Sequence, residues 1–361
     1  MKPPKILLTV LCAALVAPAT AATARPATLG CSDVSDEALD FAIEVEGDEA
    51  SGHYALPAGD PVGMVTFAHG YGHTSASWTE HLRNAARDLG VIAVAMDYRG
   101  TTIVPRHGDI PSSRGWRVAE GAQDTIAAAQ MFEAACAGLG TITNFGVSMG
   151  GNTSGLIAAA GATRADGSPL FDYWINVEGA TNVIETYFEA RTLAPANATA
   201  ANAVADIEEA FGGTFEEVPE VYQERAVVTR ADDIAASGVR NVIMVHGVDD
   251  GLVPPNQTRE MATVLRREGV PTVVTTVTFR DEQTEQDTTI TGYAGGQLDP
   301  DYRSPLAGHA SERSTTHMVM RSALGDLASI YTAAWTDCDG EWHLDGVTGM
   351  RTGHCVAPES G

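Results

Sequence analysis

Short apolar segments alternate with amphipathic segments along the chain from residue 41 onward. Short apolar runs predict buried strands, and apolar residues repeated every three or four positions predict helices. Strands separated by helices are typical of an α/β fold, with a mostly parallel central sheet and helices on both faces. We expect strands at 41–45, 53–56, 62–68, 91–96, 141–147, 173–177 and 242–245, with 272–279 as the last strand of the sheet. We expect helices at 78–89, 118–135, 152–160 and 257–267, and one more helix that continues to residue 331.

Two segments interrupt this alternation. Residues 183–235 are rich in Ala and Glu, have helical character over 204–211, and fall between two strands, which predicts a small helical cap insertion. Residues 280–308 are polar and Gly-rich, and a long excursion of this kind tends to be functional or mobile. The segment 336–361 follows the last helix as a C-terminal extension.

The N-terminus has the pattern of an export signal. Two lysines precede an apolar run over 6–17, and small residues at 19–21 and 22–24 offer alternative cleavage sites. We therefore expect a signal peptide over 1–24, a single mature domain over 25–361, and a secreted or periplasmic location. The apolar run is too short to cross a bilayer comfortably, and no later stretch approaches about 18 uninterrupted apolar residues, so no membrane span is expected.

The charge of the chain narrows the choice of partners. It carries 22 Lys+Arg and 47 Asp+Glu, a formal charge of −25. Both lysines lie in the signal, so the mature chain has 20 Arg and a charge of 20 − 47 = −27. Nucleic acids and anionic membranes are bound through clusters of Lys and Arg, and a surface this acidic repels both. Neither is therefore expected as a partner.

Four cysteines remain after removal of the signal: Cys31, Cys136, Cys338 and Cys355. In an exported protein they predict two disulfide bonds, and three pairings fit the sequence. We favour the pairing of Cys338 with Cys355, which closes a Gly-rich terminal loop, together with Cys31 and Cys136. No Cys-x-x-Cys pair is present, so the cysteines do not indicate a zinc or redox site.

The sharpest chemical motif is Gly-Val-Ser-Met-Gly-Gly at 146–151, between a predicted strand and a predicted helix. A nucleophile on so tight a turn has strained dihedral angles, and the residues two positions to either side must lack a Cβ atom. The motif therefore predicts that Ser148 is an exposed nucleophile at a helix N-terminus.

A second motif is His-Gly-Tyr-Gly at 69–72, directly after the first long apolar strand. Its simplest interpretation is a Gly-rich turn. Its functional interpretation is a loop that turns the backbone N–H of Tyr71 toward a developing oxyanion, with the N–H of Met149 as the second donor. We expect these two N–H groups to form an oxyanion hole.

A third segment, at 245–254, leaves a predicted strand and carries Asp249 and Asp250. With these three segments, the sequence resembles the α/β-hydrolase superfamily over about residues 41–331. The family pattern His-Gly-x-x-Asp-x-x-Val-Pro places the catalytic acid at Asp250 and leaves Asp249 as a solvated turn residue. Glu178 is an outside candidate, because some members carry the acid after the preceding strand.

The family order of nucleophile, acid and base places the catalytic histidine after Asp250. His309, His317, His343 and His354 qualify. His309 lies just before the last predicted helix, which is the family position, and we assign the base to it. His317 is the alternative, although its plain interpretation is a packed helix histidine. His343 and His354 look like surface residues of the C-terminal extension. The separation of 309 − 250 = 59 residues is longer than is common in the family.

The resemblance implies a Ser148–His309–Asp250 triad that forms an acyl-enzyme intermediate without a cofactor or metal. No His-Glu-x-x-His and no Gly-x-x-x-x-Gly-Lys motif is present. The segments 222–225 and 257–269 look like the catalytic domain of prolyl-oligopeptidase-type peptidases, although we expect no propeller ahead of the domain. The segment 70–78 is similar to secreted cutinases and polyester hydrolases.

Both similarities permit ester cleavage, and we expect an exported carboxylic ester hydrolase that acts on a small-molecule ester. A serine peptidase that acts on short peptides is the first alternative. A non-catalytic α/β-hydrolase-like binding protein is the second, and the presence of all three candidate residues counts against it.

Overall fold

The computed structural model describes residues 30–33, 37–104, 111–136, 138–278, 293–294, 297–298 and 309–357. The expected signal peptide at 1–24 and nearly all of the excursion at 280–308 lie outside the described residues. Within the described ranges, no helix combines the length and the apolar character needed to cross a membrane.

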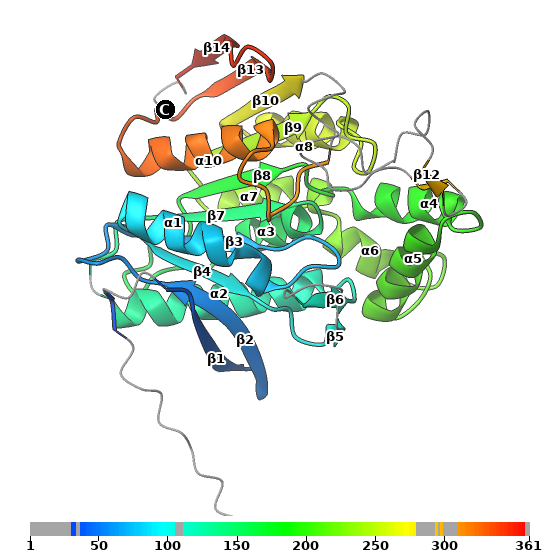
Figure 1. The fold of residues 1–361 in the computed structure, drawn as a ribbon, viewed down its shortest axis with the longest axis horizontal. Helices are drawn as coiled ribbons and strands as arrows, with labels where there is room; N and C mark the ends of the chain where they lie inside the picture. Colours follow the sequence, from blue (N-terminus) through cyan, green and yellow to red (C-terminus); the bar gives the residue numbers. More distant parts are fainter. Residues whose placement is uncertain are drawn as a thin grey trace, which may run out of the picture.

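A ten-stranded sheet forms the centre of the fold, in the order β1-β2-β4-β3-β7-β8-β9-β10-β13-β14 (Figure 1). The strands from β4 to β13 are parallel, whereas β2 and β14 run antiparallel to their neighbours. The strands are β1 (Leu39–Val45), β2 (Asp48–Ala55), β3 (Gly63–Ala68), β4 (Ile92–Met96), β7 (Thr141–Val147), β8 (Tyr173–Val177), β9 (Asn241–Gly247), β10 (Thr272–Thr278), β13 (Asp339–Asp345) and β14 (Arg351–Val356). Two small antiparallel pairs lie outside this sheet, β5 (Thr102–Val104) with β6 (Ser112–Arg114), and β11 (Tyr293–Ala294) with β12 (Gln297–Leu298).

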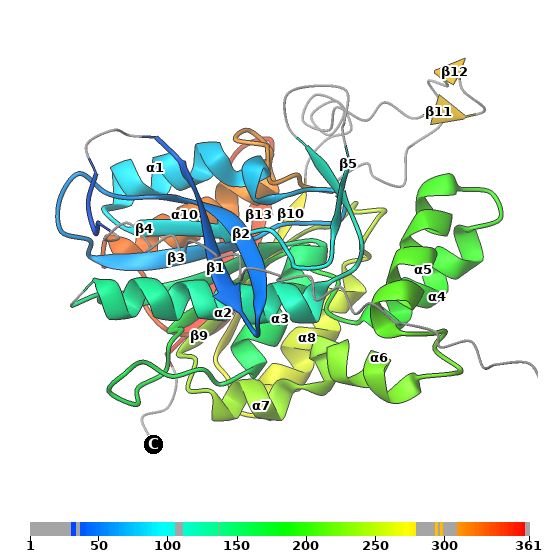
Figure 2. The ribbon, with the colours of Figure 1, turned by 90° about the horizontal axis from the view of Figure 1, so that it is seen from below.

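Helices cover both faces of the sheet (Figure 2). In β4, Ile92 and Val94 enter one hydrophobic core and Ala93 and Ala95 enter the other, because successive side chains of a strand point to opposite faces. The helices on one face are α1 (Thr79–Leu89) and α10 (Met318–Tyr331), and those on the other are α2 (Val118–Ala135), α3 (Met149–Ala159), α7 (Ala231–Ala236) and α8 (Asn256–Arg267). The predicted α/β class and its two covered faces are therefore confirmed.

A group of helices between β8 and β9 stands to one side of the sheet (Figure 2). It consists of α4 (Val183–Leu193), α5 (Ala198–Phe211) and α6 (Pro219–Arg225), followed by the short 3₁₀ helix η2 (Val227–Thr229). A second 3₁₀ helix, η1 (Ser75–Trp78), leads into α1. The side group is the helical insertion that the composition of 183–235 predicts.

The expectation that residues 272–279 form the last strand is wrong. Strands β13 and β14 extend the sheet beyond β10, within the segment expected to be a mere extension. Neither has the apolar run of a central strand: every residue of β14 is exposed, and β13 has only two buried positions. An edge of a sheet does not require a continuous buried face, so hydrophobic patterning gives no signal there. The pairing of Cys338 with Cys355, which joins these two strands, and that of Cys31 with Cys136 are both found as favoured.

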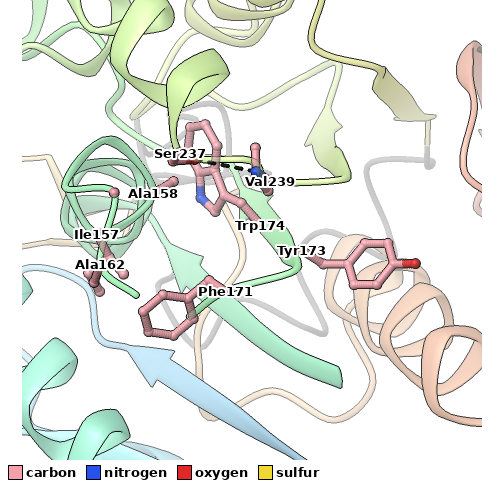
Figure 3. A pocket seen from close by; sticks show the side chains of 9 residues that line it. Ile157, Ala158, Ala162, Phe171, Tyr173, Trp174, Ser237 and Val239 are labelled. Atoms are coloured by element: carbon pink, nitrogen blue, oxygen red, sulfur yellow. Dashed lines mark hydrogen bonds between the residues drawn. The ribbon is translucent and has the colours of Figure 1, made fainter. Parts of the chain in front are cut away.

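A small pocket of about 10 Å³ lies beside the C-terminal half of α3 (Figure 3). Its lining includes Ile157, Phe171, Trp174 and Val239. This volume is at the lower limit for one water molecule. The pocket is therefore a packing defect and not a substrate site, and it lies at the opposite end of α3 from Ser148.

Candidate active site

Ser148 occupies a sharp turn between β7 and α3. Its φ of 58° and ψ of −124° lie outside the regions that L-residues normally adopt. A Cβ atom on Gly146 would lie 2.1 Å from the carbonyl oxygen of Gly150, and one on Gly150 would lie 2.1 Å from that of Ala68. The two glycines are therefore required for the turn to form, as the motif predicts. The Ser148 N–H donates to the carbonyl of Val177 at 3.0 Å, which anchors the turn to the next strand.

Asp250 lies in the loop that follows β9 and is 5% exposed, whereas Asp249 beside it is exposed. Its Oδ1 accepts hydrogen bonds from the backbone N–H groups of Leu252 at 2.8 Å and Val253 at 3.0 Å. His246 lies against the same carboxylate, with Nε2 3.3 Å from Oδ2. The loop thus fixes one carboxylate oxygen and leaves the other facing the interior.

His309 meets that second oxygen. Its Nδ1 lies 2.7 Å from Oδ2 of Asp250. Of the other histidines considered for the base, His317 is buried immediately before α10, and His343 and His354 are exposed on β13 and β14. The structure therefore brings together the acid and base positions that the sequence analysis selects, across 59 residues of chain.

The Nε2 of His309 is buried and has no hydrogen-bond partner among the described residues. Ser148 lies close to the same loops: a Cβ on Gly70 would be 3.2 Å from the Cβ of Ser148 and 2.7 Å from Oε1 of Glu312. Glu312 is three residues after His309. No hydrogen bond joins Ser148 to His309 within the described part of the chain. Catalytic hydrogen bonds commonly become short only when a substrate is bound.

A second carboxylate faces the imidazole. Glu178 directly follows β8 and is completely buried, and its Oε2 lies 3.5 Å from Nδ1 of His309. It also accepts hydrogen bonds from the backbone N–H of Gly247, at 3.0 Å, and from that of Ala310. The outside candidate for the acid is therefore next to the base, but Asp250 makes the closer contact.

These groups shift one another's ionisation. Burial alone would lower the pKa of His309, but the negative charges of Asp250 and Glu178 raise it to about 9. Burial would raise the pKa of Asp250, but His309 and His246 outweigh burial and lower it. Burial and the charge of Asp250 raise the pKa of Glu178 to about 7. The cluster therefore favours a protonated imidazole at neutral pH.

The three side chains Glu178, Asp250 and His309 each offer a ligand atom, and these atoms lie within 4.8 Å of one another, as in a metal site. However, backbone N–H groups already bond to both oxygens of Glu178 and to Oδ1 of Asp250. The remaining Oδ2 faces the imidazole of His309. Hydrogen bonds within the protein thus account for the cluster, and we do not interpret it as a metal centre.

Glu312 joins the loop of His309 to the loop of the second motif, a contact that the sequence analysis missed. Its side chain is 2% exposed, and it bonds to the backbone N–H of Gly70 and to Nδ1 of His73. Burial opposes its ionisation, but His73 and the N–H of Gly70 hold its pKa near 2, below the ordinary value for Glu. Glu312 and Gly70 are 242 positions apart, so no local pattern could reveal their contact.

This contact engages one N–H group of the loop. The N–H of Gly70 is used by Glu312, whereas those of Tyr71 and Met149 donate to no other described residue. The side chain of Tyr71 is also fixed, because its hydroxyl donates to Asp206 of α5. The N–H groups of Tyr71 and Met149 are therefore free of acceptors among the described residues, and both stay candidates for the expected oxyanion hole.

We expect the replacement of Glu312 by alanine to lower the free energy of unfolding by about 3 kcal/mol at pH 7, because it leaves a buried N–H and His73 without an acceptor. Since the folded-state pKa of Glu312 lies below the unfolded value, its stabilisation is present above about pH 4 and is lost as the pH falls toward 2.

Urea denaturation at pH 7 and at pH 3 measures both effects. The control is Glu341→Ala, which removes a 67% exposed partner of Arg266 and should cost less than about 1 kcal/mol at either pH. Equal losses for the two variants would contradict the importance of the Glu312 contact.

The sheet topology and the serine turn define an α/β-hydrolase fold. The profile of the prolyl oligopeptidase family matches residues 75–283, more than half of the chain. The chain belongs to the prolyl oligopeptidase family, and it is a serine hydrolase. The matched segment contains Ser148 and Asp250 and ends before His309. A comparison with curated protein sequences finds no match.

Solved structures share the fold at low sequence identity. A puromycin hydrolase is 19% identical, with a TM-score of 0.53, over 82% of this chain and 39% of its own. The uncomplexed acylaminoacyl peptidase of Pyrococcus horikoshii is 16% identical, with a TM-score of 0.51, over 80% of this chain and 41% of its own. An esterase of the archaeon Pyrobaculum calidifontis is 18% identical, with a TM-score of 0.50, over 82% of this chain and 83% of its own. The chain thus spans about two fifths of the length of the puromycin hydrolase and of the acylaminoacyl peptidase, and these likenesses show the fold alone.

Proposed function

We propose that this protein is an exported serine hydrolase that cleaves carboxylic esters through an acyl-enzyme intermediate. The observation that carries the proposal is the 2.7 Å contact between His309 and Asp250, together with a serine held in a strained strand-to-helix turn. A serine, an imidazole and a carboxylate are the three groups that together activate a serine hydroxyl, and this chain offers them from three distant segments.

In this proposal Nε2 of His309 removes the proton from Oγ of Ser148, and Oγ attacks the acyl carbon. Asp250 accepts the Nδ1–H bond and stabilises the imidazolium that forms. His309 then gives the proton to the departing alcohol, and water hydrolyses the acyl-enzyme by the same route. The imidazole nitrogen without a partner is the one that this reaction requires.

The oxyanion of the tetrahedral intermediate is stabilised by the N–H groups of Tyr71 and Met149. Both are without a described acceptor, and Met149 is the first residue of α3, where the helix dipole is positive. Removal of one such donor typically costs about 10²- to 10³-fold in kcat. The Glu312 contact supports this role because it fixes the loop that carries Tyr71.

Family membership favours a second candidate, a serine peptidase that acts on short peptides. The same triad serves both reactions, because each begins with attack on an acyl carbon. An alkoxide or phenoxide leaves with less protonation than an amine, so an enzyme of either kind cleaves an activated ester. Ester cleavage is therefore the less demanding reaction for this site, and we propose it as the primary activity. Peptide cleavage would be an additional activity.

The expected export of the protein is part of the same proposal. Two disulfide bonds, Cys31–Cys136 and Cys338–Cys355, close loops in the described part of the chain. Disulfide bonds form and persist in oxidising compartments outside the cytoplasm. This supports a secreted or periplasmic location. The test is to express the protein with its native leader and to determine by mass spectrometry whether the leader has been removed.

The direct test of the nucleophile is labelling with a fluorophosphonate followed by peptide mapping, which needs no knowledge of the substrate. We expect one phosphonylated serine, at Ser148, because only an activated hydroxyl reacts. Labelling elsewhere, or none in the folded protein, would reject the proposal. Initial rates on p-nitrophenyl acyl esters and on matched peptidyl anilides then rank the esterase against the peptidase.

A further inference from the structure

The imidazole of His309 faces two carboxylates, although a serine triad requires only one. Nδ1 lies 2.7 Å from Oδ2 of Asp250 and 3.5 Å from Oε2 of Glu178, and all three side chains are buried. Asp250 alone accounts for the orientation of the ring. The second carboxylate therefore needs an explanation of its own.

Glu178 is held in place by the backbone of the two loops that carry the acid and the base. Its Oε1 accepts from the N–H of Gly247 at the end of β9, and its Oε2 accepts from the N–H of Ala310, next to His309. Its own φ of 48° is unusual for a residue with a side chain. A residue held this firmly in such a conformation is a fixed part of the site.

We propose that Glu178 is a positioning residue that keeps a second negative charge beside the imidazole, so that His309 becomes a free base only at alkaline pH. The inference rests on the proposed function, because it concerns the base of the same triad. It goes further by assigning the pH range in which that base works.

The charges around the ring determine the sign of the effect. Asp250, Glu178 and Glu312 bring negative charge toward His309, His246 faces the carboxylates of Asp250 and Glu178, and His73 contacts Glu312. Loss of the imidazolium proton leaves the carboxylates of Glu178 and Asp250 without a positive neighbour in a buried site. His309 therefore releases its proton at a higher pH than a free imidazole does, in agreement with the raised pKa of His309.

The experiment measures the protonation of His309 directly and through activity. The imidazole resonances of His309 are followed by NMR against pH in the wild type and in Glu178→Gln, and the acidic limb of kcat/KM on a p-nitrophenyl ester is measured in parallel. We expect a wild-type midpoint above the ordinary 6.5 and a midpoint lower by about one to three pH units in Glu178→Gln. Glu178→Asp, which keeps the charge, should stay near the wild type.

The matched control is Glu341→Gln, which removes an exposed carboxylate on β13 and should leave the midpoint unchanged. A wild-type midpoint at or below 6.5, or an unmoved midpoint in folded Glu178→Gln, would overturn the inference. The midpoint of the wild type is measured without any variant. The proposal can therefore still be contradicted if the Glu178→Gln protein does not fold. The NMR titration does not depend on turnover, so it tests the role of Glu178 alone. Fluorophosphonate labelling of Ser148 tests the proposed function separately, and the two failures can therefore be told apart.

Discussion

Replacement of Ser148 by alanine is expected to lower kcat for a p-nitrophenyl ester by about 10⁶-fold. The turn at φ 58° presents one hydroxyl between the strand end of β7 and the N-terminus of α3. Without that oxygen no acyl-enzyme forms, and the remaining groups only bind the substrate and stabilise the oxyanion. The measurement is the initial rate of p-nitrophenolate release at saturating substrate, at a pH where His309 is neutral.

Structural damage does not explain a loss of this size, because alanine keeps the Cβ atom and the backbone N–H that donates to Val177. Circular dichroism and thermal unfolding should therefore match the wild type. The control is Ser168→Ala, which removes an exposed hydroxyl bonded only to Asp166 and should leave kcat unchanged. Turnover that survives in Ser148→Ala would mean that another group attacks the ester.

The sequence was most informative where structure depends on neighbours in the chain. The bounds of α2, β7 and β8 agree with the predicted ranges. The turn at Ser148 was also predictable, since its flanking glycines are a local steric requirement. The family pattern selected Asp250 over Asp249, and the structure buries the first and exposes the second.

What the sequence could not predict is long-range pairing between polar groups. Strands β13 and β14 escaped detection because their stability comes from ladder hydrogen bonds and a disulfide bond at the sheet edge, not from an apolar run. Glu312 looked like one of many acidic residues, although its carboxylate joins two loops inside the protein. The sequence does not distinguish a buried glutamate from a solvated one. Only the three-dimensional structure shows which carboxylates are buried.

The same distinction applies to Glu178. As a sequence position it competed with Asp250 for the role of the acid, but the structure places both beside one imidazole at different distances. The closer oxygen orients the ring, and the farther one acts through its charge. Two candidates that were alternatives in the sequence therefore take complementary positions in the fold.

Replacement of Asp250 by asparagine is expected to lower kcat by about 10⁴-fold. The carboxylate Oδ2 accepts the Nδ1–H of His309 and so, in the proposed triad, leaves the lone pair of Nε2 available to Ser148. An amide NH₂ in that place favours the opposite tautomer, in which Nε2 carries the proton and cannot act as a base. Asparagine can still accept from the N–H of Leu252 and Val253 through its carbonyl oxygen, so the loop should keep its conformation.

The neighbouring Asp249→Asn variant is the matched control, because it makes the same chemical change at an exposed position one residue away. Its kcat should equal that of the wild type. Fluorophosphonate labelling of Ser148 should slow in Asp250→Asn and stay unchanged in Asp249→Asn, since labelling depends on the same base. If both variants lost activity equally, the loop and not the carboxylate of Asp250 would be responsible, and the acid would have to be sought at Glu178.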